Sequence, residues 1–147
     1  MSKFVIAGGL GILGRATAAA LSEIGHQIAL VDFAPAPEGG GDADLVIGNC
    51  DLADEKAVAE AYRQVHERWG VIDGLVNVAG GFLWEPVSDG SLGSWDRMYR
   101  MNLRTAVASS SAAMPYLRAG SAIVNVGAAA ATAPGIGMAP MPLRKPE

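Results

Sequence analysis

The sequence has very little cysteine and histidine: Cys50 is its only cysteine, and His26 and His66 are its only histidines. One cysteine excludes a disulfide bond within the chain and suits a reducing compartment, so we expect a cytoplasmic protein. Neither histidine has a second His or Cys at the spacing of a metal-binding motif, which argues against a metal site.

The sequence also has no dense cluster of basic residues, and its 11 Lys and Arg residues are fewer than its 15 Asp and Glu residues. Both observations argue against nucleic acid as a partner. The N-terminus begins with a lysine and an apolar run, like a secretion signal. Four glycines interrupt this run, however, and no small-residue cleavage pattern follows. Residues 119–143 carry no charge, but their prolines and glycines oppose a membrane-spanning helix. We therefore expect no membrane association.

Short apolar runs alternate with stretches of helical periodicity. Strands are predicted at 3–7, 27–33, 44–48, 71–80 and 121–127, and helices at about 13–24, after Asp51 or Asp54, and at about 94–118. The second helix has one apolar stripe, formed by Val58, Ala61, Tyr62, Val65 and Trp69. This alternation predicts a single α/β domain over residues 1–147, with a Rossmann-like doubly wound parallel sheet in the order 3-2-1-4-5 that is truncated after its fifth strand.

A glycine-rich loop lies between the first strand and the first helix, in the segment VIAGGLGILGRA. A tight turn of this kind needs positive φ angles, and a pyrophosphate can approach its backbone closely because no side chain intervenes. The amide groups at the helix N-terminus then face the phosphates. We expect the loop to bind a dinucleotide through Gly8, Gly9, Gly11, Ile12, Leu13 and Gly14. The alternative is a purely structural turn.

Asp32 ends the second predicted strand and is followed by Phe33. A carboxylate at this place can accept hydrogen bonds from both ribose hydroxyls of an adenosine, and it repels a 2′-phosphate. No Arg or Lys immediately follows Asp32 to hold such a phosphate. We therefore expect NAD as the cofactor rather than NADP, bound in part by Asp32 and Phe33. The alternative for Asp32 is a solvated loop carboxylate.

Nearly the whole sequence resembles the short-chain dehydrogenase/reductase family, because four of its segments match family motifs in the right order. The segment CDLAD resembles the family's site beside the adenine ring, NVAG resembles its Asn-Asn-Ala-Gly segment, MNLRTA matches its helix asparagine, and IVNVGA matches its fifth strand. The resemblance implies an NAD(P)-dependent hydride transfer to a carbonyl or pterin-like substrate. The residues that it assigns are Asp51, Leu52, Ala79, Gly80 and Gly81 for the cofactor and Asn102 for catalysis.

The sequence also departs from the family's commonest pattern. The spacing of Gly8, Gly11 and Gly14 is instead similar to the family's extended branch and to dihydropteridine reductases, and the segments VAGGF and GAAAA also resemble the latter. Gly127 and Ala128 stand where most members have a serine that orients the substrate. Counted from Ala128, the family's catalytic lysine falls on Lys145, but its tyrosine falls on Met141, which has no proton to donate.

We therefore interpret residues 138–147 as an aberrant tail. A shift of one base before Met141 would restore a Tyr-Ala-small-small-Lys segment, so we hypothesise a frameshift; a truly divergent end is the alternative. We expect impaired catalysis, or a non-catalytic dinucleotide-binding module. A long apolar edge on the fifth strand would also invite pairing with another copy of the chain.

Overall fold

The computed structural model describes residues 1–39, 43–131, 133 and 135–138. Within these residues five parallel strands form one sheet in the order β3-β2-β1-β4-β5, which confirms the predicted order and direction. The strands are β1 (Lys3–Ala7), β2 (Gln27–Val31), β3 (Leu45–Ile47), β4 (Ile72–Asn77) and β5 (Leu117–Asn125).

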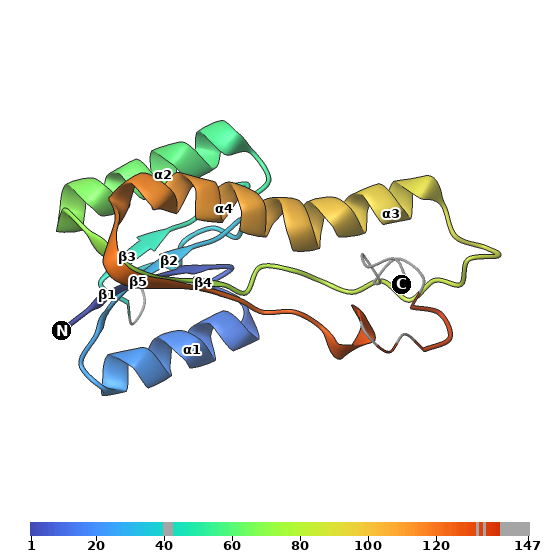
Figure 1. Cartoon of the computed structure of the whole chain (residues 1–147), viewed down its shortest axis with the longest axis horizontal. Helices are drawn as coiled ribbons and strands as arrows, with labels where there is room; N and C mark the ends of the chain where they lie inside the picture. Colours follow the sequence, from blue (N-terminus) through green and yellow to red (C-terminus); the bar gives the residue numbers. More distant parts are fainter. Residues whose placement is uncertain (40–42, 132, 134, 139–147) are drawn as a thin grey trace.

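Helices cover both faces of this sheet (Figure 1). α1 lies on one face, and α2 and α4 lie together on the other, where they contact each other. The bounds are α1 (Ile12–Glu23), α2 (Glu55–Trp69), α3 (Leu92–Tyr99) and α4 (Thr105–Ala113), with a π-helical turn η1 (Arg100–Arg104) between α3 and α4. No helix in the described part of the chain is long and apolar enough to cross a membrane.

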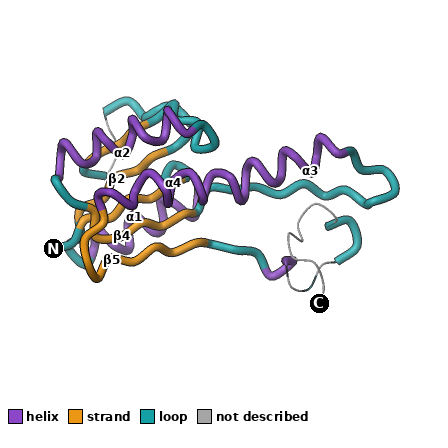
Figure 2. The backbone as a smooth tube through the Cα atoms, turned by 45° about the horizontal axis from the view of Figure 1, so that its top comes forward, coloured by secondary structure: helices purple, strands orange, loops and turns teal. Residues whose placement is uncertain are grey.

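Several predicted boundaries were wrong. The strands expected at 27–33 and 71–80 end at Val31 and Asn77, and the strand expected from 121 begins at Leu117. The helix expected at about 94–118 is a helical segment that begins at Leu92 and is not uniform, because η1 lies between α3 and α4 and the 3-10 turn η2 (Met114–Tyr116) ends it. β5 then begins at Leu117, which pairs with Ile72 of β4, so tertiary strand pairing overrides the local helical pattern. Figure 2 shows α3 projecting beyond the sheet, with α4 lying over the strands.

The core consists of two layers, one on each face of the sheet. Val5 and Ala7 of β1 face α2, and Ile6 between them faces α1, as the period of two along a strand requires. The predicted stripe of α2 is confirmed: all five of its side chains are buried.

Of the two candidate caps for α2, the structure selects Asp54, whose side chain accepts from the N–H groups of Lys56 and Ala57 at 2.9 Å each.

Candidate dinucleotide site

The glycine loop joins the carboxyl end of β1 to the N-terminus of α1 and is held by close backbone contacts. Gly8 has φ +86° and donates its N–H to the carbonyl of Val31 at 2.8 Å. A Cβ on Gly8 would lie 2.5 Å from the backbone nitrogen of Ala79, and one on Gly14 would overlap the carbonyl oxygen of Gly8. These two glycines are therefore required by packing alone, whether or not a ligand binds.

The N-terminus of α1 has the features of an anion site. Its first turn carries no acidic residue, and no side chain caps it. Gly11 occupies the N-cap position, and the side chains of Ile12 and Leu13 point outward, being 94% and 51% exposed. The first N–H groups of a helix have no partner within the helix and carry a partial positive charge, which favours a phosphate there.

Asp32 ties the glycine loop to the segment after β2. Its Oδ2 accepts from the backbone N–H of Leu10 at 2.8 Å, and its Oδ1 accepts from that of Ala34 at 2.9 Å. Each carboxylate oxygen keeps a second lone pair, so acceptor capacity remains for a ribose hydroxyl. Phe33 is 72% exposed beside it.

Asp51 and Leu52 follow β3 on the next loop. Leu52 is buried, whereas Asp51 lies at the surface of a cleft and forms an ion pair with Arg100 at 2.6 Å. Cys50, directly before them, is buried. Burial chiefly, and then the nearby carboxylates of Asp51, Asp54 and Asp32, raise the pKa of the Cys50 thiol to about 11. Cys50 is therefore protonated at neutral pH and is not a nucleophile.

The segment after β4 packs against the helix that carries Asn102. The side-chain Oδ1 of Asn102 accepts from the N–H of Gly81 at 2.9 Å, and its Nδ2 donates to the carbonyl of Met98 at 3.1 Å. A Cβ on Gly80 would lie 2.5 Å from the same Oδ1. The glycines at 80 and 81 thus let the strand end approach the helix, and Asn102 anchors them there.

A cleft of about 640 Å³ opens at the carboxyl ends of the central strands. Among the predicted cofactor residues, those that line it are Gly8, Gly11, Asp32, Phe33, Asp51, Leu52, Ala79 and Gly80. The remaining ones, which lie next to this lining and not in it, are Gly9, Ile12, Leu13, Gly14 and Gly81. The loops that follow β1, β2, β3 and β4 and the helical segment from α3 to α4 therefore meet at one place.

Sequence reasoning missed one wall of this cleft, which the helical segment after Trp95 supplies. Arg97, Arg100, Met101 and Thr105 line it, at intervals that place them on one side of a helix. Met101 is only half-buried, whereas Met98, three residues before it, is buried. The helical spacing of these residues was a usable signal.

The predicted catalytic Lys145, and Met141 at the tyrosine position, lie outside the described residues. Just before them, the chain passes beside the segment after β4: Glu85 donates its N–H to the carbonyl of Gly137 at 2.7 Å, and Trp84 Nε1 donates to the carbonyl of Ile136 at 3.2 Å. Trp84 remains 62% exposed. Met138, the first residue of the predicted tail, forms an isolated parallel bridge with Glu85.

The parallel sheet, its order and the glycine loop at the end of β1 define a Rossmann-like protein. A family model described as enoyl-(acyl carrier protein) reductase matches residues 9–145. The chain is 36% identical over 137 residues to the D-threitol dehydrogenase of Mycolicibacterium smegmatis, covering 87% of this chain and 53% of that protein. It is 32% identical over 108 residues to a short chain dehydrogenase/reductase, dpmpG, of Macrophomina phaseolina, covering 67% and 62%.

Solved structures agree with these relatives. A short-chain dehydrogenase/reductase from Serratia marcescens superposes with a TM-score of 0.83 at 28% identity, covering 97% of this chain and 65% of that one. The chain belongs to the short-chain dehydrogenase/reductase family. It spans about half to two thirds of the length of these relatives. The comparisons support the family but not the narrower likeness to dihydropteridine reductases.

Proposed function

We propose that this chain binds NAD in the cleft and belongs to an oxidoreductase that interconverts an alcohol and a carbonyl compound. The observation that carries the proposal is the junction of the glycine loop with Asp32: the loop presents backbone to a pyrophosphate, and the carboxylate is hydrogen-bonded to that same loop. The family in general uses NAD or NADP. Relatives named D-threitol dehydrogenase and levodione reductase favour an alcohol or ketone over a pterin as the substrate class.

The residues of the cleft fit a dinucleotide. Gly11 at the N-cap of α1 lines the cleft, and because it has no side chain its backbone is open to a ligand there. Asp32 and Asp51 offer carboxylate acceptors for ribose and adenine, and the N-terminus of α1 offers donors for the phosphates. When bound, the nicotinamide group would give or accept a hydride.

Titration of NADH and NADPH, followed by nicotinamide fluorescence, tests the cofactor. We expect NADH to bind more tightly, and Asp32→Ala to narrow the difference, because a carboxylate repels the 2′-phosphate of NADPH. Asp44→Ala is a matched control, since Asp44 also accepts a hydrogen bond from a backbone N–H, that of Ile28 at 2.8 Å, but does not line the cleft. Equal affinities in the unchanged protein, or a preference for NADPH, would contradict the role given to Asp32.

Reduction of a carbonyl also needs a proton donor, and the residues at the family's positions do not supply one. Gly127, Ala128 and Met141 have no hydroxyl group. We therefore expect little or no turnover from this chain, and losing a positioned general acid typically costs about 10²- to 10⁴-fold in rate. A non-catalytic dinucleotide-binding module is the second candidate function, and this absence of hydroxyl groups favours it.

Two measurements, NADH oxidation and NADH binding, separate these functions. NADH oxidation is assayed with ketones, aldehydes and quinonoid pterins, for this chain and for a polypeptide translated from the gene with the proposed extra base. Turnover by the second polypeptide alone supports the impaired enzyme, and turnover by neither, with NADH bound, supports the binding module. Strong turnover by this chain would show that the alignment of Met141 with the tyrosine is wrong.

Self-association is a further part of the proposal. Within the described residues β5 pairs only with β4, so its other edge offers unpaired backbone groups. Sedimentation at increasing concentration tests for a dimer through this edge. We expect Val126→Lys to weaken the dimer, and a chain that stays monomeric at all concentrations would refute this part.

A further inference from the structure

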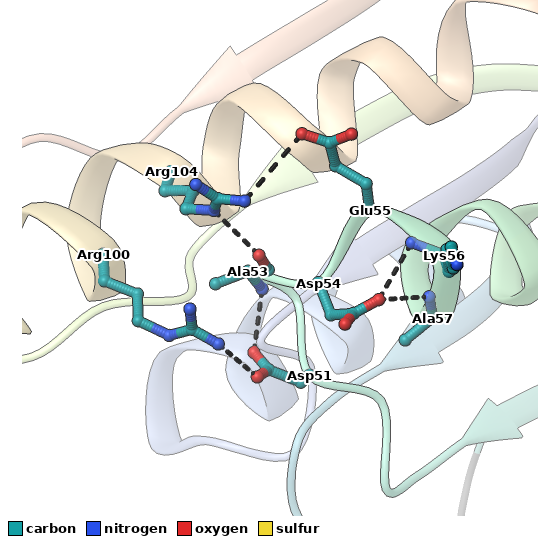
Figure 3. A network of polar contacts seen from close by, with 8 residues as sticks. All are labelled: Asp51, Ala53, Asp54, Glu55, Lys56, Ala57, Arg100 and Arg104. Atoms are coloured by element: carbon teal, nitrogen blue, oxygen red, sulfur yellow. Dashed lines mark hydrogen bonds and ion pairs between the residues drawn. The ribbon is translucent and has the colours of Figure 1, made fainter.

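Two arginines from the long helical segment hold the loop that follows β3 (Figure 3). Arg100 Nη2 donates to Asp51 Oδ2 at 2.6 Å, and Arg104 Nε donates to the carbonyl of Ala53 at 2.9 Å. The two arginines lie four residues apart, so both reach toward the same loop. They differ in one respect: Arg100 lines the cleft and Arg104 does not.

The carboxylate of Asp51 is held at both of its oxygens. Oδ1 accepts from the N–H of Ala53 at 2.9 Å, and Oδ2 accepts from Arg100. Rotation of the carboxylate would break at least one of these two contacts. Each oxygen still has a second lone pair. Because Asp51 lines the cleft, this acceptor capacity is available at the cleft wall, in one fixed orientation.

The ion pair has a second consequence for an anionic ligand. Asp32 and Asp51 place two carboxylates in the cleft, and these repel a pyrophosphate. The positive charge of Arg100 offsets the negative charge of Asp51. The side chain of Arg100 is 53% exposed, so solvent screens the attraction between the two groups. The contribution of this ion pair to folding stability is therefore small.

We propose that Arg100 is a positioning residue for the purine ring: it fixes Asp51 so that the carboxylate accepts a hydrogen bond from the 6-amino group of adenine. This inference rests on the proposed dinucleotide function. It predicts discrimination between adenine and a purine without that amino group. Hypoxanthine is the suitable probe, because it carries a carbonyl acceptor where adenine carries the amino donor.

The experiment measures dissociation constants for NADH and for reduced nicotinamide hypoxanthine dinucleotide. We expect the unchanged protein to prefer NADH by about fivefold to twentyfold, the range of one hydrogen bond to a partly exposed carboxylate. Arg100→Met and Asp51→Ala should each bring the preference below about twofold. Arg100→Lys, which keeps the charge but not the planar donor group, should restore part of it.

Arg104→Met is the matched control, since it removes a guanidinium group from the same helix and the same loop but not from the cleft. It should keep the preference of the unchanged protein, even if both affinities fall together. An equal loss of preference in Arg104→Met would mean that the arginines merely anchor the loop, and it would overturn the proposal.

Three other results also decide the matter. A preference that survives unchanged in Arg100→Met would show that Asp51 does not need Arg100, and a preference that rises would show that Arg100 blocks Asp51; either result would overturn the proposal. Equal binding of both dinucleotides by the unchanged protein would refute this inference and leave the proposed function standing. Failure to bind either dinucleotide would refute the proposed function itself. If Arg100→Met folds poorly by circular dichroism, Arg100→Gln supplies the same comparison.

Discussion

The neighbouring strands β4 and β5 have similar apolar sequences but very different surroundings. Leu75 and Val76 in β4 are 0% and 9% exposed, whereas Val124 of β5, which pairs directly with Val76, is 51% exposed. β4 lies between β1 and β5 and is covered by α4, and β5 has a neighbour on one edge only. An apolar strand sequence therefore shows that burial is possible, and the neighbours decide whether it happens.

The same contrast explains where the candidate site lies. The ends of β1, β2 and β4 meet inside the sheet, where helices and loops from both faces can reach them. Asn77 at the end of β4 is buried, and its Nδ2 donates to Asn125 of β5 at 2.8 Å and to Ser110 of α4 at 3.1 Å. This residue links β5 to the better-packed part of the molecule at the edge where the cleft opens.

The largest expected effect comes from breaking the packing around β4. Leu75→Ala should lower the free energy of unfolding by about 2–5 kcal/mol, because Leu75 is fully buried and its truncation leaves a cavity. Val124→Ala should change it by about 0.5 kcal/mol or less, since half of that side chain is already in water. Urea unfolding, monitored by tryptophan fluorescence, measures both values. Similar losses would show that β5 is covered in solution.

A smaller effect is expected from the polar contact between the two helices that cover β4. The hydroxyl groups of Tyr62 and Ser109 are hydrogen-bonded in the interior, and burial raises the pKa of Tyr62, so it stays protonated. Tyr62→Phe should cost about 1–2 kcal/mol, because the hydroxyl of Ser109 is left without this partner. Tyr99→Phe is the exposed control and should have little effect. A double-mutant cycle with Ser109→Ala measures the coupling, and a coupling near zero would contradict the contact.

The smallest effect concerns the cap of α2 and depends on pH. Backbone hydrogen bonds from Ala57 and then Lys56 hold the pKa of Asp54 below its usual value of 3.8. A lowered pKa in the folded state means that the stabilisation is present above the pKa of the unfolded chain and is lost as the pH falls through the folded pKa.

Asp54→Ala should therefore destabilise the protein at pH 7, and its difference from the unchanged protein should shrink below pH 3.8. Asp54→Asn keeps an oxygen for the cap but does not titrate, so its advantage over Asp54→Ala should not vary with pH. Thermal unfolding of the three proteins between pH 7 and pH 2.5 measures these differences. If the difference in stability between the unchanged protein and Asp54→Ala stayed constant across this pH range, it would contradict the role of the carboxylate.

The sequence was sufficient to predict the sheet, because short apolar runs, helical stretches between them and glycine turns are local signals. The stripe on α2 and the glycine-rich turn between β1 and α1 were predicted for the same reason. The end of the long helix was not predicted, since Leu117 enters β5 only by pairing with Ile72 of a distant segment. Lys145 and the substrate stay predictions, because they depend on residues outside the described chain.

The sequence by itself determined the alternation of strands and helices and the positions at which only glycine fits, because these follow from residue spacing and backbone sterics. The role expected of Asp32 followed from its place at the end of a strand, and that of Asp51 from the family resemblance. The tertiary structure decided which side chains surround the cleft. Arg100 is separated from Asp51 by 49 positions in the chain, and folding brings them to 2.6 Å. No local pattern contains such a contact, since it arises only when the helical segment packs across the strand ends.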